Sequence, residues 1–157
     1  MFKQNPSVSK KITTRIGLRR GSALIEAAIG LPVLIVIAII AADFGRIYFT
    51  GIAVANAARS AAEYGAQSVS NSTDTALINQ AGRDDGADAR NITVTSTRFC
   101  KCPDGSTPDC TGTCGNPYPE PEVFVKANAS STITLVFGYP GIPRTLTYRD
   151  SAVFRAQ

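Results

Sequence analysis

Histidine is absent from this chain of 157 residues, and so are the short motifs that accompany common enzyme chemistry. Histidine is the commonest general base near neutral pH. The patterns G-x-S-x-G, G-x-x-x-x-G-K-[ST], H-E-x-x-H and G-x-G-x-x-G do not occur. The densest carboxylate cluster, Asp84, Asp85 and Asp88, is typical of a solvated helix end rather than a cation site. We therefore predict a protein that is not an enzyme and that requires neither a cofactor nor a metal.

Acidic residues are missing from the first 21 positions. Because six of the 16 basic residues and none of the 12 acidic ones lie there, residues 22–157 have a net charge of −2. The basic character is confined to a tail, so nothing in the body of the chain suggests a nucleic-acid partner. Lys and Arg beside an apolar segment mark the cytoplasmic side of a membrane. We expect the N-terminus to be cytoplasmic and the C-terminal part to be exported.

Charge is also scarce in residues 22–42, where Glu26 is the sole charged side chain. As a helix this segment is long enough to cross a hydrocarbon core of about 30 Å. A carboxylate inside a membrane segment is costly, and it is therefore a functional-site hypothesis by default. The alternative is a glutamate that reaches back to the membrane surface. No proline occurs between 43 and 69, so we expect the helix to continue to residue 68, with a break near Gly51 as the main alternative.

Asp43 and Arg46 follow directly where the apolar segment ends. Their spacing of three residues places them on one side of a helix. They are interpreted either as an ion pair at the outer membrane boundary or as contacts to assembly partners.

The remaining residues, 69–157, predict a small domain. Thr75 to Arg83 suits a short helix, and β-branched alternation begins after Asn91. Three further strands are predicted over residues 123–127, 132–137 and 145–154. The predicted fold class is α+β, with a long N-terminal transmembrane helix, a short helix and an antiparallel sheet.

Four cysteines, Cys100, Cys102, Cys110 and Cys114, lie in a loop rich in Gly, Pro and Asp over residues 100–114. An even number of cysteines on an exported domain indicates disulfides, which stabilise domains with small cores. We favour the nested pairs Cys100–Cys114 and Cys102–Cys110, followed by the crossed pairs. A zinc site is the competing interpretation, but the spacing C-x-C-x7-C-x3-C departs from the common ligand spacing.

The junction RGSALIE at 20–26 resembles a type IV prepilin leader. The resemblance implies that a prepilin peptidase cuts between Gly21 and Ser22, which makes Glu26 the fifth residue of the mature chain. Two alternatives are an ordinary secretory signal cut near Ala41 and Ala42, and an uncut signal anchor.

Behind GSALIEAAIGLP, the segments DFGRIYFT at 43–50 and NAARSAAEYGA at 56–66 resemble the TadE-like family. The resemblance implies a pilin-like helix and a minor pseudopilin, a structural assembly component of a tight-adherence (Flp, type IVc) pilus. Its implied partners are the membrane, prepilin peptidase, other pilins and pseudopilins, and the inner-membrane assembly platform. In that setting Glu26 would set the register by meeting the free amino group of a neighbour's Ser22.

The resulting organisation has three parts. They are a cleaved cytoplasmic leader (1–21), a transmembrane and projecting helix (22–68) and a periplasmic or extracellular α+β domain (69–157). The protein would be a single-pass component of a bacterial inner membrane, staying at the base of the pilus or entering the filament. The alternative function is a membrane-anchored periplasmic binding domain, for which the helix is only a tether.

Overall fold

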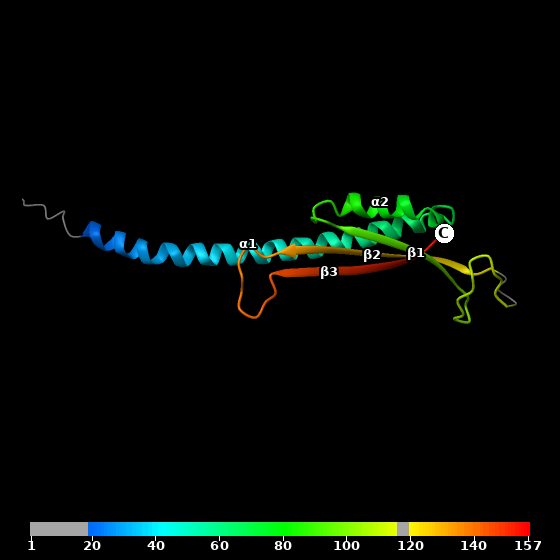
Figure 1. The fold of residues 1–157 in the computed structure, drawn as a ribbon. Helices are drawn as coiled ribbons and strands as arrows, with labels where there is room; N and C mark the ends of the chain where they lie inside the picture. Colours follow the sequence, from blue (N-terminus) through cyan, green and yellow to red (C-terminus); the bar gives the residue numbers. More distant parts are fainter. Residues whose placement is uncertain (1–18, 116–119) are drawn as a thin grey trace, which may run out of the picture. The chain divides into compact units, whose positions relative to one another are not determined.

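The computed structural model describes residues 19–115 and 120–157. The chain divides into two compact units, residues 1–38 and 39–157. The described part of the first unit is helical. The second unit contains the rest of that helix, a short helix and a sheet (Figure 1).

The long helix α1 runs from Arg19 to Ala66. Residues 22–42 are almost entirely apolar, and the following residues are rich in alanine, a strong helix former. The helix includes Pro32 and passes Gly51 without interruption, as the absence of later prolines predicts. It begins three residues before the predicted start, so the last residues of the basic segment, including Gly21, are helical. The remainder of that segment lies outside the described residues.

A single 3₁₀ turn (Asn71–Thr73) leads into α2, which spans Thr75–Asp85. The prediction of a short helix from Thr75 is confirmed. Its N-cap is Asp74, whose carboxylate accepts a hydrogen bond from the Leu77 N–H at 3.0 Å. The cap satisfies one of the unpaired N–H groups of the first turn.

The sheet is an antiparallel meander in the order β1 (Thr93–Lys101), β2 (Glu122–Thr134) and β3 (Thr145–Arg155). The prediction of two separate strands over 123–127 and 132–137 is wrong. Strand β2 is continuous through its small central residues and ends before residue 135. Both neighbouring strands supply it with backbone partners, so Asn128, for example, lies between Thr95 and Ser151.

The core of the second unit is built from small side chains. One face of α1 packs on the inner face of the sheet and on Ile78 of α2. The buried cluster consists of Val54, Ala57, Ala58, Ala61, Ala62, Ile78, Val94, Val125, Ala127 and Ala129. Alanine on both the helix and the central strand lets the two backbones approach closely. A Cβ atom added to Gly65 would lie 2.8 Å from Val125 Cγ1, so this contact has no room for a side chain.

Candidate functional site

The predicted cleavage junction lies in the first unit, on α1. Gly21 and Glu26 are both exposed there. No described side chain pairs with the Glu26 carboxylate in a hydrogen bond or an ion pair. Within this single chain, therefore, nothing described balances the charge of Glu26.

The apolar side chains around Glu26 are equally uncovered. The large ones between Leu24 and Ile37 have exposed fractions of 51–72%. α1 is long and apolar enough to cross a membrane. An apolar surface of this extent requires lipid or other protein around it.

Asp43 occupies the most unusual position in the second unit. Its carboxylate is buried, with 1% of the residue exposed. It accepts hydrogen bonds from the backbone N–H groups of Val136 and Phe137, both at 3.1 Å, and from the Tyr139 hydroxyl at 3.2 Å. Arg46 Nη1 lies 3.6 Å from Asp43 Oδ1. Asp43 thus holds the loop between β2 and β3 against α1.

These hydrogen bonds also affect the ionisation of Asp43 and Tyr139. The Val136 N–H has the largest effect and lowers the pKa of Asp43, whereas burial raises this pKa. The Phe137 N–H, the Tyr139 hydroxyl and the charge of Arg46 lower it further. Burial, followed by the charge of Asp43, raises the pKa of Tyr139. Asp43 is therefore ionised and Tyr139 is neutral at neutral pH, which is the state in which the hydroxyl donates.

The predicted interaction between Asp43 and Arg46 is thus only part of this arrangement. The structure brings the two side chains together, but the main partners of Asp43 are backbone N–H groups more than 90 residues away in sequence. Spacing along a helix cannot reveal such partners. The available signal was indirect, an apolar, aromatic loop (LVFGYPGIPR, 135–144) in an otherwise polar domain.

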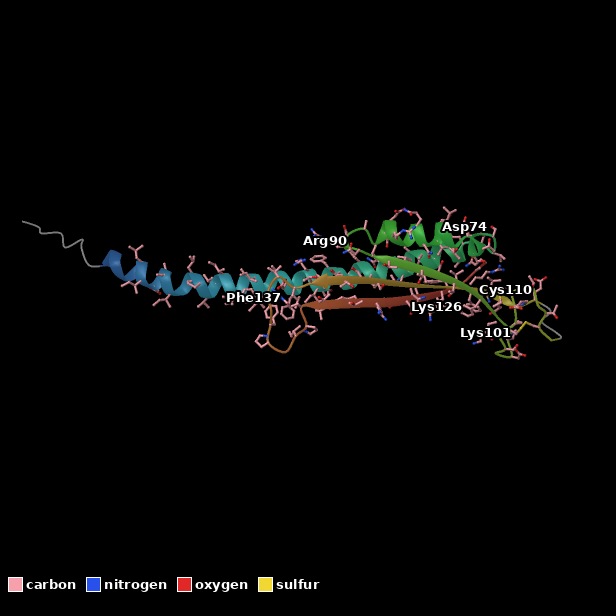
Figure 2. All side chains as sticks on the ribbon, in the orientation of Figure 1. Asp74, Arg90, Lys101, Cys110, Lys126 and Phe137 are labelled. Carbon is pink, nitrogen blue, oxygen red and sulfur yellow. A yellow bond between two sulfur atoms is a disulfide. The ribbon has the colours of Figure 1, made fainter. Side chains whose placement is uncertain are left out.

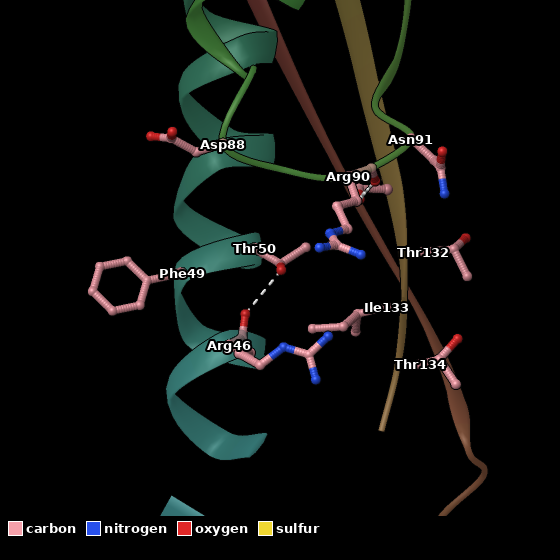
Figure 3. Close-up of a pocket in the computed structure, with 10 residues that line it drawn as sticks. Arg46, Phe49, Thr50, Asp88, Arg90, Asn91, Thr132, Ile133 and Thr134 are labelled. Atoms are coloured by element: carbon pink, nitrogen blue, oxygen red, sulfur yellow. Dashed lines mark hydrogen bonds between the residues drawn. The ribbon is translucent and has the colours of Figure 1, made fainter. Parts of the chain in front are cut away.

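Arg46 also borders a groove between α1 and the sheet. Figure 3 shows the guanidinium groups of Arg46 and Arg90 extending into the same space, between α1 and Ile133 of β2. Thr50 lies on the helix side and donates to the Arg46 carbonyl at 2.8 Å. The groove encloses about 340 Å³ and presents two cations.

We predict that Asp43→Ala releases the β2–β3 loop. The substitution removes the acceptor of the Val136 and Phe137 N–H groups and of the Tyr139 hydroxyl, so loop opening should increase by roughly tenfold. The measurement is limited trypsin cleavage after Arg144, whose carbonyl accepts from the Leu135 N–H in the closed loop. Cleavage after Lys126, in the central strand, is the internal control and should not accelerate. Equal acceleration at both sites would contradict a local role.

The same contact predicts a pH dependence. Because the pKa of Asp43 is lower in the folded chain, its stabilising effect is complete above the unfolded value near 4 and is lost as the pH falls below it. Cleavage of residues 135–144 by pepsin, a protease that is active in acid, should therefore accelerate in the native chain as the pH falls from 5 to 3. Asp43→Asn, which keeps one acceptor oxygen and does not titrate, should show a weaker dependence between pH 5 and 3.

The cysteines form two disulfides, as predicted, but the favoured nested pairing is wrong. The bonds are crossed, Cys100–Cys110 and Cys102–Cys114, with Cα–Cα distances of 5.1 and 5.8 Å. Cys100 lies in β1 and Cys102 directly follows the strand, and both are buried. The chain turns immediately after Cys102, where the Gly105 N–H donates to the Cys102 carbonyl, and the two cysteines therefore take separate partners from the returning loop. None of the four cysteines is free.

The disulfide loop and the Asp43 site lie at opposite ends of the second unit. Figure 2 shows Cys110 beyond one end of the sheet and Phe137 beside α1 at the other. The cysteine loop (residues 100–114) and the pair Asp43 and Arg46 are therefore two separate regions of the domain.

The fold defines a class: a chain whose apolar helix, long enough to cross a membrane, continues into a small α+β domain. Residues 21–63 match the family model described as TadE-like protein, which confirms the resemblance over this segment. The match associates the chain with the tight-adherence pilus system. It covers the junction at Gly21, Glu26 and the pair Asp43 and Arg46, and it ends before α2 and the sheet. No curated protein and no solved structure matched the chain.

Proposed function

We propose that the chain is a minor pseudopilin, a structural component that helps to assemble a tight-adherence pilus. The observation that carries this proposal is the TadE-like match over residues 21–63, which coincides with the Gly21–Ser22 junction and Glu26. A structural role agrees with the composition, since histidine and the common catalytic motifs are lacking.

In this proposal, residues 22–42 cross the bacterial inner membrane after prepilin peptidase removes residues 1–21. The N-terminus is cytoplasmic and the domain from residue 69 onward is periplasmic. The uncovered apolar side chains from Leu24 to Ile37 first contact lipid and then pack against the helices of other pilins and pseudopilins at the assembly platform. Glu26 pairs with the amino terminus of a neighbouring subunit during this exchange.

Changing the order of the residues in the apolar helix distinguishes a subunit that packs against other helices from a protein whose helix is only a membrane tether. The variant rearranges residues 27–42 while keeping their composition, the cleavage junction and Glu26. A tether needs only hydrophobicity, whereas packed helices need specific side chains at specific positions. We expect normal processing and membrane insertion but loss of surface pili, measured by microscopy of the native bacterium.

The matched control exchanges only Leu34 and Ile35, which preserves volume and should retain pili. Normal piliation in the permuted variant would contradict the pseudopilin and would favour the membrane-anchored binding domain. Loss of the protein itself, seen by immunoblot, would show that the rearrangement disturbed insertion, and a second permutation of residues 33–42 alone would then replace it.

A further inference from the structure

The β2–β3 loop (residues 135–144) exposes apolar side chains beside the point where the apolar part of α1 ends. Val136 and Phe137 are 65% and 53% exposed, and Ile142 is 43% exposed. On α1, Phe44, Tyr48 and Phe49 are exposed as well. Phe44 and Phe137 both lie near Tyr139, with ring centroids 6.4 and 6.2 Å apart from it. The loop and the helix therefore share one aromatic surface.

The position of this surface along the chain points to its partner. Asp43, which anchors the loop, is the residue directly after the apolar segment 22–42. One helical turn advances about 5.4 Å, and the headgroup region extends roughly 5–8 Å beyond each side of the hydrocarbon core. Residues 43–46 and the loop attached to them thus fall in the interfacial layer when α1 spans a bilayer. Aromatic side chains concentrate at this depth in membrane proteins.

Part of the loop backbone is hydrogen-bonded within the domain, whereas the N–H groups of Gly138, Tyr139 and Gly141 are left to the water of the interface, which suits a shallow position. Irregular backbone near lipid is tolerated only where its polar groups have partners. The N–H groups of Val136 and Phe137 bond to Asp43, that of Leu135 bonds to the Arg144 carbonyl, and that of Ile142 bonds to the Tyr139 carbonyl. Pro140 and Pro143 have no N–H group to satisfy. Burial of the Asp43 carboxylate under the loop also keeps this charge away from lipid.

We propose that the β2–β3 loop inserts shallowly into the outer leaflet of the bilayer that α1 crosses, with Phe137 and Ile142 as its membrane contacts. The partner is a lipid surface rather than a protein. The guanidinium groups of Arg46 and Arg90 face the adjoining groove (Figure 3). In this arrangement they would be available to lipid phosphates. The loop holds the domain against the membrane. This inference rests only on the membrane-spanning part of the proposed function, not on the pilus.

The sequence contains no tryptophan, so single substitutions give clean fluorescent reporters. The full chain is reconstituted in phosphatidylcholine and phosphatidylglycerol vesicles whose acyl chains carry bromine, a short-range quencher, at a shallow or a deep position. The reporters are Phe137→Trp and Ile142→Trp in the loop. Leu77→Trp is the control, because Leu77 is an exposed apolar residue on α2, away from the loop.

We expect Phe137→Trp and Ile142→Trp to lose fluorescence with shallow bromine, to lose less with deep bromine, and to emit at shorter wavelength than Leu77→Trp, which neither lipid should quench. Ile37→Trp, within the apolar segment, should be quenched most by deep bromine. If Ile37→Trp is quenched but the two loop reporters are not, the loop insertion is contradicted while the membrane span stands. An unquenched Ile37→Trp would overturn the membrane span and the inference with it. A blue-shifted loop emission without quenching would assign the surface to protein contact and would also contradict the inference.

Discussion

Replacing Glu26 with alanine should leave the leader cleavable and abolish assembly. The substitution makes residues 22–42 entirely uncharged, so insertion into the membrane becomes easier rather than harder. Under the proposed function, it removes the partner of a neighbour's amino group. When one member of a buried ion pair is deleted, the charge left behind costs about 3–5 kcal/mol. A subunit that cannot neutralise its neighbour should therefore fail to leave the bilayer for the bundle.

The measurement is twofold: immunoblotting for the cleaved form, and microscopy or shearing for surface pili. Glu26→Gln keeps the length and hydrogen-bonding capacity of the side chain without its charge, and it should fail in the same way. Glu63→Ala is the matched control on the same helix, because Glu63 forms an exposed pair with Arg59 at 2.7 Å that should contribute little. Loss of cleavage together with loss of pili would contradict the register role of Glu26.

Replacing Gly21 with leucine should block removal of the leader. Gly21 lies inside α1 in the uncut chain. A peptidase needs the backbone around the bond that it cuts to be locally unwound. Glycine weakens a helix by roughly 0.5–1 kcal/mol relative to alanine, so it favours opening at this bond. It also presents no side chain to the peptidase. Leucine restores helix propensity and adds bulk at the cut, and both effects oppose cleavage.

Gly21 is a clean position for this test because a Cβ atom added there would meet nothing within 4 Å. A processing defect would therefore reflect the peptidase step and not the fold. Gly21→Ala is the graded control, with an intermediate rate expected from its smaller side chain. The uncut chain should accumulate in the membrane and form no pili. Normal maturation of Gly21→Leu would mean that the junction is not the cleavage site.

The elements that the sequence predicted correctly depend on local patterns. The apolar run and the absence of proline in residues 43–69 predict α1. The change at Thr75, from a polar turn to a sequence that suits a helix, predicts α2. The centre of β2, with Asn128 and two serines, has the composition of a turn, so the sequence predicts two strands where the structure has one. That composition is instead explained by tertiary structure: Ala127, Ala129 and Ser131 are small because α1 and its neighbours approach the central strand closely.

The site shows the same division between local and long-range information. The spacing of Asp43 and Arg46 predicted their proximity, since three residues make nearly one helical turn. The pairing of Asp43 with the N–H groups of Val136 and Phe137 depends on how the sheet returns to α1, and no local pattern encodes that. The disulfide pairing failed for a similar reason, because loop length alone does not determine which cysteines meet.

The central claim is that this chain matures by cleavage at the border of its basic leader and its apolar helix. The most direct test is the N-terminal residue of the protein purified from its native membrane, determined by Edman degradation or mass spectrometry. We predict Ser22. A chain that begins at Met1 in functional pili, or one that begins near Asp43, would contradict the pseudopilin and would indicate an uncut anchor or an ordinary secreted protein.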